Sequence, residues 1–200
     1  MNKEEFIALI ESMEENCEGY GEDWFNEDEI IKFLEDNKSD KEVFQISIKF
    51  HPDILEYADE IITDDIEFMT NAVNEWGKYA LLYASNRIKD DEIIVIEAIK
   101  YKLKSFSHVL DVVSERLRNN IEIVEFAMNC CLDPDTFEEL QYASYEIKSN
   151  KSFLLKQLDN FTENFDNPVF LKYISDDLKN DAEFVKKLVE INPNSEKYLK

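Results

Sequence analysis

The sequence predicts an all-α fold, a solenoid-like array of antiparallel helix-pair repeats of about 25–31 residues with a helical cap at its N-terminus. Three observations predict it: an apolar motif that recurs along the chain, a capping residue that recurs after each copy, and the positions of the prolines. The chain also has only three glycines and four prolines, a composition that argues against a β-rich or disordered protein.

A leucine marks each copy of the motif. It recurs at a nearly regular spacing, at Leu55, Leu81, Leu110, Leu140 and Leu171. Apolar or small residues mostly follow it at three, four and seven positions, which is the spacing of one face of an α-helix. We therefore expect one helix to run from each leucine through the seventh residue after it. A tyrosine two positions after most of these leucines lies off that face and should contact a neighbouring helix, as stacked repeats require.

A second helix should follow each of these. Its start is marked by a short polar side chain able to accept a hydrogen bond from a first-turn amide, at Asp40, Asp65, Asp91, Asn120, Asn150 and Asp181. An apolar pair follows three and four residues after each of these caps. The prolines agree with this scheme, because each falls where the tyrosine-bearing helix should begin, at Pro52, Pro134, Pro168 and Pro193.

Residues 1–39 do not carry the motif. An amphipathic helix is predicted over residues 2–18, and a second, short helix is predicted around Ile30–Leu34. Terminal units of repeat proteins are atypical, so we interpret residues 1–39 as an acidic helical cap. The repeat array then spans residues 40–200 as one continuous structural domain.

The motif resembles the bacterial and protist helical repeats known as domain of unknown function 4116. Their units read roughly as apolar, x, Tyr, Ala, Ser, x, x, apolar, Lys, x, Asp, x, Glu, apolar, apolar. The stretch Leu81–Val95 and the unit at Leu140 match best, whereas the unit at Leu110 has valines in place of Tyr-Ala and the unit at Leu171 has Ile174 in place of Ala. The resemblance covers roughly residues 40–200. It implies a helical scaffold, often a protein-binding one.

The chain is strongly acidic, with a net charge of −23, and residues 1–40 hold 14 acidic and 3 basic side chains. This charge disfavours direct binding to nucleic-acid phosphates or to anionic membranes, and it favours a basic protein partner. There is no apolar run of the roughly 18 residues that a membrane span needs, and the N-terminus lacks the layout of a signal peptide. We therefore expect a cytoplasmic protein.

The sequence offers little for catalysis. It has no glycine-rich phosphate loop and no His-Glu-x-x-His motif, and we interpret His51 and His108 as surface or capping residues. An odd number of cysteines does not suggest a disulfide framework, so Cys130 and Cys131 are expected to be small apolar residues near a helix end. We expect no catalytic residues, no cofactor and no metal.

The candidate partner-binding site is a group of acidic residues around a tryptophan, namely Glu22, Asp23, Trp24, Glu27, Asp28 and Glu29. The same acids could simply form a solvated face that favours a helix N-terminus. We expect a non-enzymatic protein–protein interaction module that binds a basic partner and inhibits or masks it, by analogy with immunity proteins and inhibitors.

Two alternatives stay open. One is an acidic mimic of nucleic acid that competes for a DNA- or RNA-binding protein. The other is an enzyme or accessory subunit with an unrecognised site, for which the sequence offers His108 with Cys130 or Cys131 as a nucleophile pair. The oligomeric state is left open.

Overall fold

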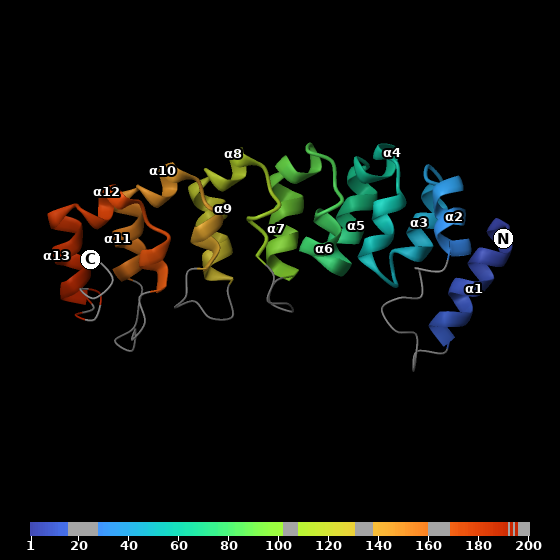
Figure 1. Cartoon of the computed structure of the whole chain (residues 1–200), viewed down its shortest axis with the longest axis horizontal. Helices are drawn as coiled ribbons and strands as arrows, with labels where there is room; N and C mark the ends of the chain where they lie inside the picture. The colour runs from blue at the N-terminus through green and yellow to red at the C-terminus, as the bar shows by residue number, and fades with distance from the viewer. Residues whose placement is uncertain are drawn as a thin grey trace. The chain divides into compact units, whose positions relative to one another are not determined.

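The computed structural model describes residues 1–15, 28–101, 108–130, 138–159, 169–191, 193 and 195. Every regular element within these residues is an α-helix or a 3-10 helix, and they contain no strand. The predicted all-α class is therefore confirmed. The chain forms two compact units, Met1–Tyr101 (unit 1) and Lys102–Lys200 (unit 2) (Figure 1).

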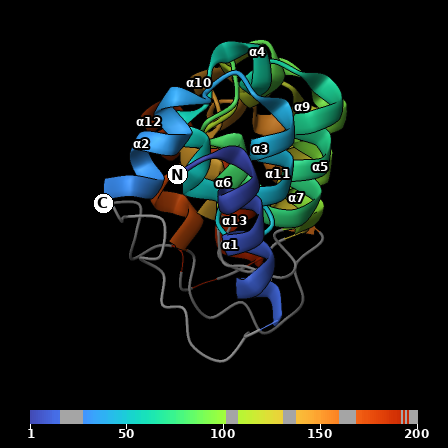
Figure 2. The ribbon, with the colours of Figure 1, turned by 90° about the vertical axis from the view of Figure 1, so that its right-hand side faces the viewer.

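Unit 1 holds nine of the described elements. In chain order they are α1 (Lys3–Glu15), α2 (Asp28–Asp36), α3 (Lys41–Ser47), the 3-10 helix η2 (Pro52–Tyr57), α4 (Glu60–Thr63), α5 (Ile66–Trp76), α6 (Lys78–Leu81), the 3-10 helix η3 (Ile88–Asp90) and α7 (Glu92–Tyr101). Helix α1 packs against α3, and α5 packs against α6 and α7; α5 and α7 run alongside each other (Figures 1 and 2). The motif leucines Leu55 and Leu81 are buried in the core, as predicted.

Unit 2 repeats the alternation of one short and one longer helix. Its described elements are α8 (Glu115–Arg118), α9 (Ile121–Asn129), η6 (Glu138–Tyr142), α10 (Tyr145–Lys148), α11 (Lys151–Asp159), η7 (Val169–Lys172), α12 (Asp176–Lys179) and α13 (Ala182–Ile191). Helix α11 packs against α13, and α9 packs against η6. The motif leucines are again buried, at Leu110, Leu140 and Leu171.

The predicted single helix after each leucine is wrong, because the chain breaks it in two. Leu140 lies in η6, and the separate helix α10 begins after Ser144, whose backbone is extended (φ −62°, ψ 163°). The hydroxyl oxygen of Ser144 accepts a hydrogen bond from the Ile147 amide at 3.2 Å. The serine is therefore an N-cap, and its side chain competes with a continuous helix for the backbone amides.

A backbone hydrogen bond to the preceding repeat explains why this residue leaves the helix. Its amide donates to the carbonyl two residues before the preceding cap: Asp59 to Lys38 (2.8 Å), Ser85 to Thr63 (3.0 Å), Ser144 to Arg118 (2.9 Å) and Ser175 to Lys148 (3.0 Å). In a continuous helix this amide would bond within its own segment. Within each unit, consecutive repeats are thus joined through the backbone at the motif serine.

The predicted capping residues are confirmed. Each accepts hydrogen bonds from first-turn amides of the helix it precedes, at Asp40, Asp65, Asp91, Asn120, Asn150 and Asp181. Asn2, which the sequence analysis does not identify as a cap, does the same for α1 by accepting from the Glu5 amide at 2.9 Å.

Lysines connect several of these caps. In each case a lysine one position after one cap pairs with the aspartate that caps a later helix: Lys3 with Asp40 (2.6 Å), Lys41 with Asp65 (2.7 Å) and Lys151 with Asp181 (2.9 Å). Helix α1 joins this series although residues 1–39 lack the motif. The predicted division at residue 39 stays a prediction.

The cap at Asp65 gives a pH-dependent prediction. The Lys41 ammonium and the Phe68 amide both donate to its carboxylate and hold the pKa of Asp65 below its ordinary value. A depressed carboxyl pKa stabilises the fold above the unfolded value near 4, and this contribution is lost as the pH falls through the folded value. Asparagine caps a helix about as well but carries no charge.

We therefore expect Asp65→Asn to lower the free energy of unfolding at pH 7, and the difference from the wild type to disappear at acid pH. Urea unfolding of both proteins at pH 7, 5, 4 and 3 measures it, and comparing the two proteins at each pH cancels most of the general effect of acid. Introducing the substitution into a Lys41→Gln background should reduce the difference at pH 7. A difference that stays constant across these pH values would contradict the assignment.

The motif tyrosine contacts the preceding repeat, as predicted. The Tyr83 hydroxyl donates to Asp53 at 2.9 Å, and burial together with this bond raises the pKa of Tyr83. In unit 2 the ring of Tyr142 lies 5.3 Å from the ring of His108. Asp53 and His108 occupy the same motif position, two residues before the leucine. The tyrosine thus serves as an inter-repeat contact.

We expect Tyr83→Phe to lower the free energy of unfolding by about 1–2 kcal/mol, because the bond to a charged acceptor is lost while the ring still packs. Urea unfolding measures this change. Tyr79→Phe is the matched control, since Tyr79 is 44% exposed and its substitution should have an effect within about 0.5 kcal/mol. Equal effects at the two tyrosines would show that the Asp53 bond contributes nothing.

The basic residue eight positions after the motif leucine hydrogen-bonds to the end of the short segment that contains the leucine. It donates to the backbone carbonyl seven residues before it: Lys89 to Leu82 (2.7 Å), Arg118 to Asp111 (2.7 Å) and Lys148 to Gln141 (2.6 Å). Basic side chains commonly satisfy the last carbonyls of a helix in this way. Burial lowers the pKa of Lys89 and of Lys148.

The predictions for the first proline and histidine hold as well. Pro52 begins η2, and the Nδ1 atom of His51 caps that helix by accepting from the Asp53 amide at 3.2 Å. Pro134 and Pro168 lie outside the described residues. Among the helices that the structure describes, none combines the length and the apolar character needed to cross a membrane.

Candidate protein-binding surface

Most of the predicted acidic site lies outside the described residues, namely Glu22, Asp23, Trp24 and Glu27. Asp28 and Glu29 begin α2, and both are exposed. The Glu29 carboxylate lies 3.1 Å from the amino group of Met1, and 72% of its side chain is exposed. The binding role of this group stays a prediction.

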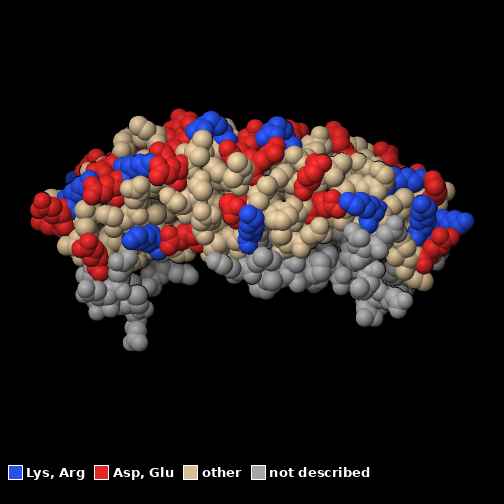
Figure 3. Space-filling model, turned by 180° about the vertical axis from the view of Figure 1, so that it is seen from behind, with Lys and Arg blue, Asp and Glu red and all other residues tan. Residues whose placement is uncertain are grey.

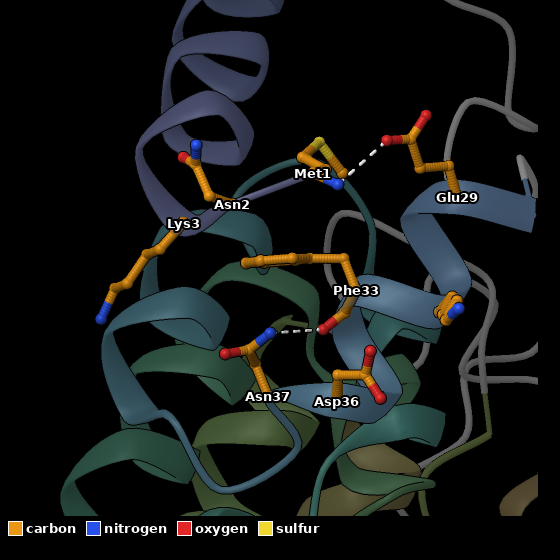
Figure 4. A pocket seen from close by; sticks show the side chains of 8 residues that line it. Met1, Asn2, Lys3, Glu29, Phe33, Asp36 and Asn37 are labelled. Carbon is orange, nitrogen blue, oxygen red and sulfur yellow. Dashed lines mark hydrogen bonds and ion pairs between the residues drawn. The ribbon is translucent and has the colours of Figure 1, made fainter.

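Glu29 also borders a cleft of about 580 Å3 between the start of α1 and α2 (Figure 4). Its charged lining has both signs, with Glu29 and Asp36 as carboxylates and Lys3 and Lys32 as ammonium groups. Phe33 lies under it and stacks on Phe6 with ring centroids 4.5 Å apart.

Two of the polar groups around this cleft are used inside the fold. Lys3 pairs with Asp40 at 2.6 Å and with Glu42 at 2.8 Å. The Asn37 side-chain amide donates to the Phe33 carbonyl at 2.8 Å (Figure 4). A lining of mixed sign whose polar groups hold α1, α2 and α3 together favours no particular class of ligand by its charge.

His108 lies between two glutamates, whereas the sequence predicts a surface or capping position for it. Its Nδ1 atom is 3.4 Å from the Glu139 carboxylate, and its Nε2 atom is 3.4 Å from the Glu138 carboxylate. Glu139 is fully buried and accepts from the Leu110 amide at 3.4 Å. Burial and nearby acids, Asp111 first among them, raise the pKa of Tyr142 beside this cluster.

The sequence carries a signal for this cluster that the motif search misses. Glu139 stands directly before the motif leucine, where other repeats have Ile54, Ala80 and Val109. A charged residue in an apolar position needs a partner when it is buried. The partner is in the preceding repeat, so a search for acids at metal-ligand spacing along the chain does not find it.

The residues of the predicted nucleophile pair are only partly described. Cys130 lies half-buried at the C-terminal end of α9, near a helix end as predicted, whereas Cys131 lies outside the described residues. Within the part of the chain that the structure describes, no three His, Cys, Asp or Glu side chains are grouped so as to hold a metal ion. The enzyme alternative stays a hypothesis.

An unpredicted surface in unit 1 exposes three large apolar side chains. Ile61 in α4, Ile66 in α5 and Ile93 in α7 are exposed by 71%, 49% and 72%, and Glu60 and Glu67 beside them are exposed as well. We call these five residues the isoleucine edge. They occupy the first turns of three helices, of which α4 contacts α5 and α5 contacts α7.

Backbone and side-chain bonds hold these helix starts together. The Ser85 amide donates to the Thr63 carbonyl at 3.0 Å, and the Arg87 guanidinium pairs with Asp64 at 3.0 Å. Ser85 and Arg87 shortly precede α7, while Thr63 and Asp64 shortly precede α5. The N-termini of α5 and α7 therefore lie on the same edge of unit 1.

Core packing does not account for these isoleucines. The position of Ile93, two residues after the cap, is polar in every other repeat: Glu42, Glu67, Glu122, Ser152 and Glu183. Comparing the repeats at this position is the sequence signal that could have identified the edge.

Charged side chains of both signs are interspersed with uncharged surface on the face drawn in Figure 3.

The model of the family described as domain of unknown function (DUF4116) matches residues 65–112 and 165–199. The resemblance predicted from the motif is confirmed over these residues, which are part of the predicted range 40–200. The first DUF4116 match contains Leu81–Val95, one of the two best motif copies, together with Ile66 and Ile93, and the second contains the copy at Leu171. The other best copy, at Leu140, lies outside both matches. No curated protein and no solved structure gives a significant match.

Proposed function

We propose that this chain is a non-enzymatic protein–protein interaction module that binds a basic partner protein and masks it, in the manner of an immunity protein or inhibitor. The observation that carries the proposal is the isoleucine edge. Exposed apolar side chains that lie together on a polar surface mark interaction sites. Ile61, Ile66 and Ile93 are exposed in the first turns of neighbouring helices of one unit.

The polar side chains of the motif are hydrogen-bonded within the fold, and this supports the same proposal. Ser85 accepts from the Ile88 amide and donates to the preceding repeat, Lys89 binds a carbonyl, Tyr83 binds Asp53, and Asp91 caps α7. Residues engaged in this way build a scaffold. Contacts with a partner are then made by residues that differ between repeats, and Ile93 is one of these residues.

We also propose that the helix pairs stack in a solenoid-like array. The hydrogen bonds from the motif serine to the preceding repeat support it within each unit, because they recur with the same geometry, as in Ser85 to Thr63 and Ser144 to Arg118. Stacked repeats contact mainly their neighbours and leave an edge open for binding.

The nucleic-acid mimic receives less support. A mimic needs rows of uncompensated negative charge at phosphate-like spacing. Three of the recurring aspartates, Asp40, Asp65 and Asp181, instead pair with lysines.

The test compares the wild type with the triple variant Ile61→Ser, Ile66→Ser, Ile93→Ser. Each protein is immobilised and used to capture partners from a host lysate, and a captured partner is then purified and titrated calorimetrically. The control variant Ile121→Ser, Ile191→Ser changes isoleucines of unit 2 that are 36% and 40% exposed. Circular dichroism checks that both variants fold, as expected for changes at exposed positions.

We expect the wild type and the control to bind one basic partner with defined stoichiometry, and the triple variant to lose it. Binding that is unchanged in the triple variant would contradict the role of the edge. If none of the three proteins binds any partner, the binding function itself is contradicted.

A further inference from the structure

We infer that the isoleucine edge binds an amphipathic helix of its partner, with Lys or Arg beside the apolar face of that helix. The inference rests on the proposed function and specifies the partner's chemistry.

The spacing of the supporting helices favours a helical partner. Ile66 and Ile93 stand in the first turns of α5 and α7, which pack against each other, and the axes of packed helices lie about 8–10 Å apart. Two turns of a helix advance about 10.5 Å from residue i to i+7, so a helix with apolar residues at i, i+3, i+4 and i+7 can span both helix starts. An extended partner has no strand edge to pair with among the described residues, because they contain no strand.

The charges on the edge select a basic helix. Glu60 and Glu67 are exposed beside the isoleucines. Three basic side chains of the adjoining segments are engaged within the fold: Lys41 with Asp65 at 2.7 Å, Arg87 with Asp64 at 3.0 Å, and Lys89 with the Leu82 carbonyl at 2.7 Å. An approaching acidic helix would meet the two glutamates, whereas Lys or Arg flanking the apolar stripe would pair with them.

The probes are three labelled peptides of about 18 residues, a length that forms about five helical turns. The first contains Leu and Lys with leucines on one helical face. The second has the same composition with Leu and Lys alternating, which gives a strand pattern, and the third has the helical pattern with Glu in place of Lys. Fluorescence anisotropy measures binding to the full chain at low and high salt. The alternating peptide controls for general attraction to a chain of net charge −23.

We expect the wild type to bind the helical Leu/Lys peptide about tenfold or more tightly than either other peptide, which corresponds to about 1.4 kcal/mol. The triple isoleucine variant should lose this preference. Glu60→Gln with Glu67→Gln should weaken binding and flatten its salt dependence, while Ile121→Ser, Ile191→Ser should stay within about twofold of the wild type.

Equal affinity for the helical and alternating peptides would overturn the inference, and so would unchanged binding by the triple isoleucine variant. If the chain shows no preference for the helical Leu/Lys peptide but capture from lysate still depends on the isoleucines, the helical partner is excluded and the proposed function stands. If capture fails as well, both are wrong.

Discussion

Gly77→Ala should lower the free energy of unfolding by about 2–6 kcal/mol, the sum of a backbone cost and a steric cost. Gly77 joins α5 to α6 with φ of 56° and ψ of −127°, a conformation that L-residues rarely adopt. Holding a residue with a Cβ there costs of order 1–3 kcal/mol. A Cβ at this position would also lie 2.3 Å from Cδ1 of Tyr101, and overpacking of this kind typically costs about a further 1–3 kcal/mol.

A double-mutant cycle separates the two causes. Tyr101→Ala removes the ring but keeps its Cβ, which lies 2.9 Å from the position of the new atom, and it does not change the backbone of residue 77. Gly77→Ala should therefore be less destabilising in the Tyr101→Ala background, yet still cost about 1–3 kcal/mol. Urea unfolding of the four proteins gives the coupling energy. A change in the single variant no larger than that of an ordinary surface substitution, about 0.5 kcal/mol, would contradict the strained conformation.

The repeat spacing indicates a short connection at Gly77 but not its backbone conformation. The interval from Leu55 to Leu81 is the shortest of those between successive motif leucines, so this repeat has the least chain with which to connect its helices. The structure makes the connection through the single residue Gly77. Periodicity located the helices on either side but carried no information about the backbone angles between them.

Local signals predicted the fold where the physical cause is local. A capping side chain such as Asp65 bonds to an amide three positions away, and a buried leucine such as Leu140 repeats at a recognisable spacing. The break at Ser144 was missed because its cause lies elsewhere, in the carbonyl of Arg118 in the preceding repeat. The glutamate partners of His108 were not predicted for the same reason, since they belong to the following repeat.

The candidate surface shows the same limit. Asp28 and Glu29 were predicted as site residues because charge can be read directly from the sequence. Ile93 directly precedes the apolar pair that follows its cap, but it is 72% exposed whereas its neighbour Ile94 is 1% exposed. Exposure of an apolar residue is a tertiary property, so a functional surface made of such residues is the hardest feature to predict from one sequence.

Leu81→Ala should lower the free energy of unfolding by about 2–5 kcal/mol, the range for truncating a fully buried leucine. Leu81 is 0% exposed and lies in α6, which packs on α5, α7 and η2. The next residue provides the matched control: Leu82 is 42% exposed and its truncation removes the same atoms. Leu82→Ala should cost less than about 1 kcal/mol, since much of its apolar area is already in water.

The pair tests whether the motif leucine is the position that holds each repeat together. Both variants replace leucine by alanine and so change intrinsic helix propensity equally. A difference between their free energies of unfolding therefore reports how deeply each leucine is buried. Urea unfolding followed by tryptophan fluorescence measures it, with Trp76 at the end of α5 as a probe within the same unit. Similar losses at Leu81 and Leu82 would mean that the register of α6 on α5 is wrong, because a shift by one residue exchanges the buried and exposed leucines.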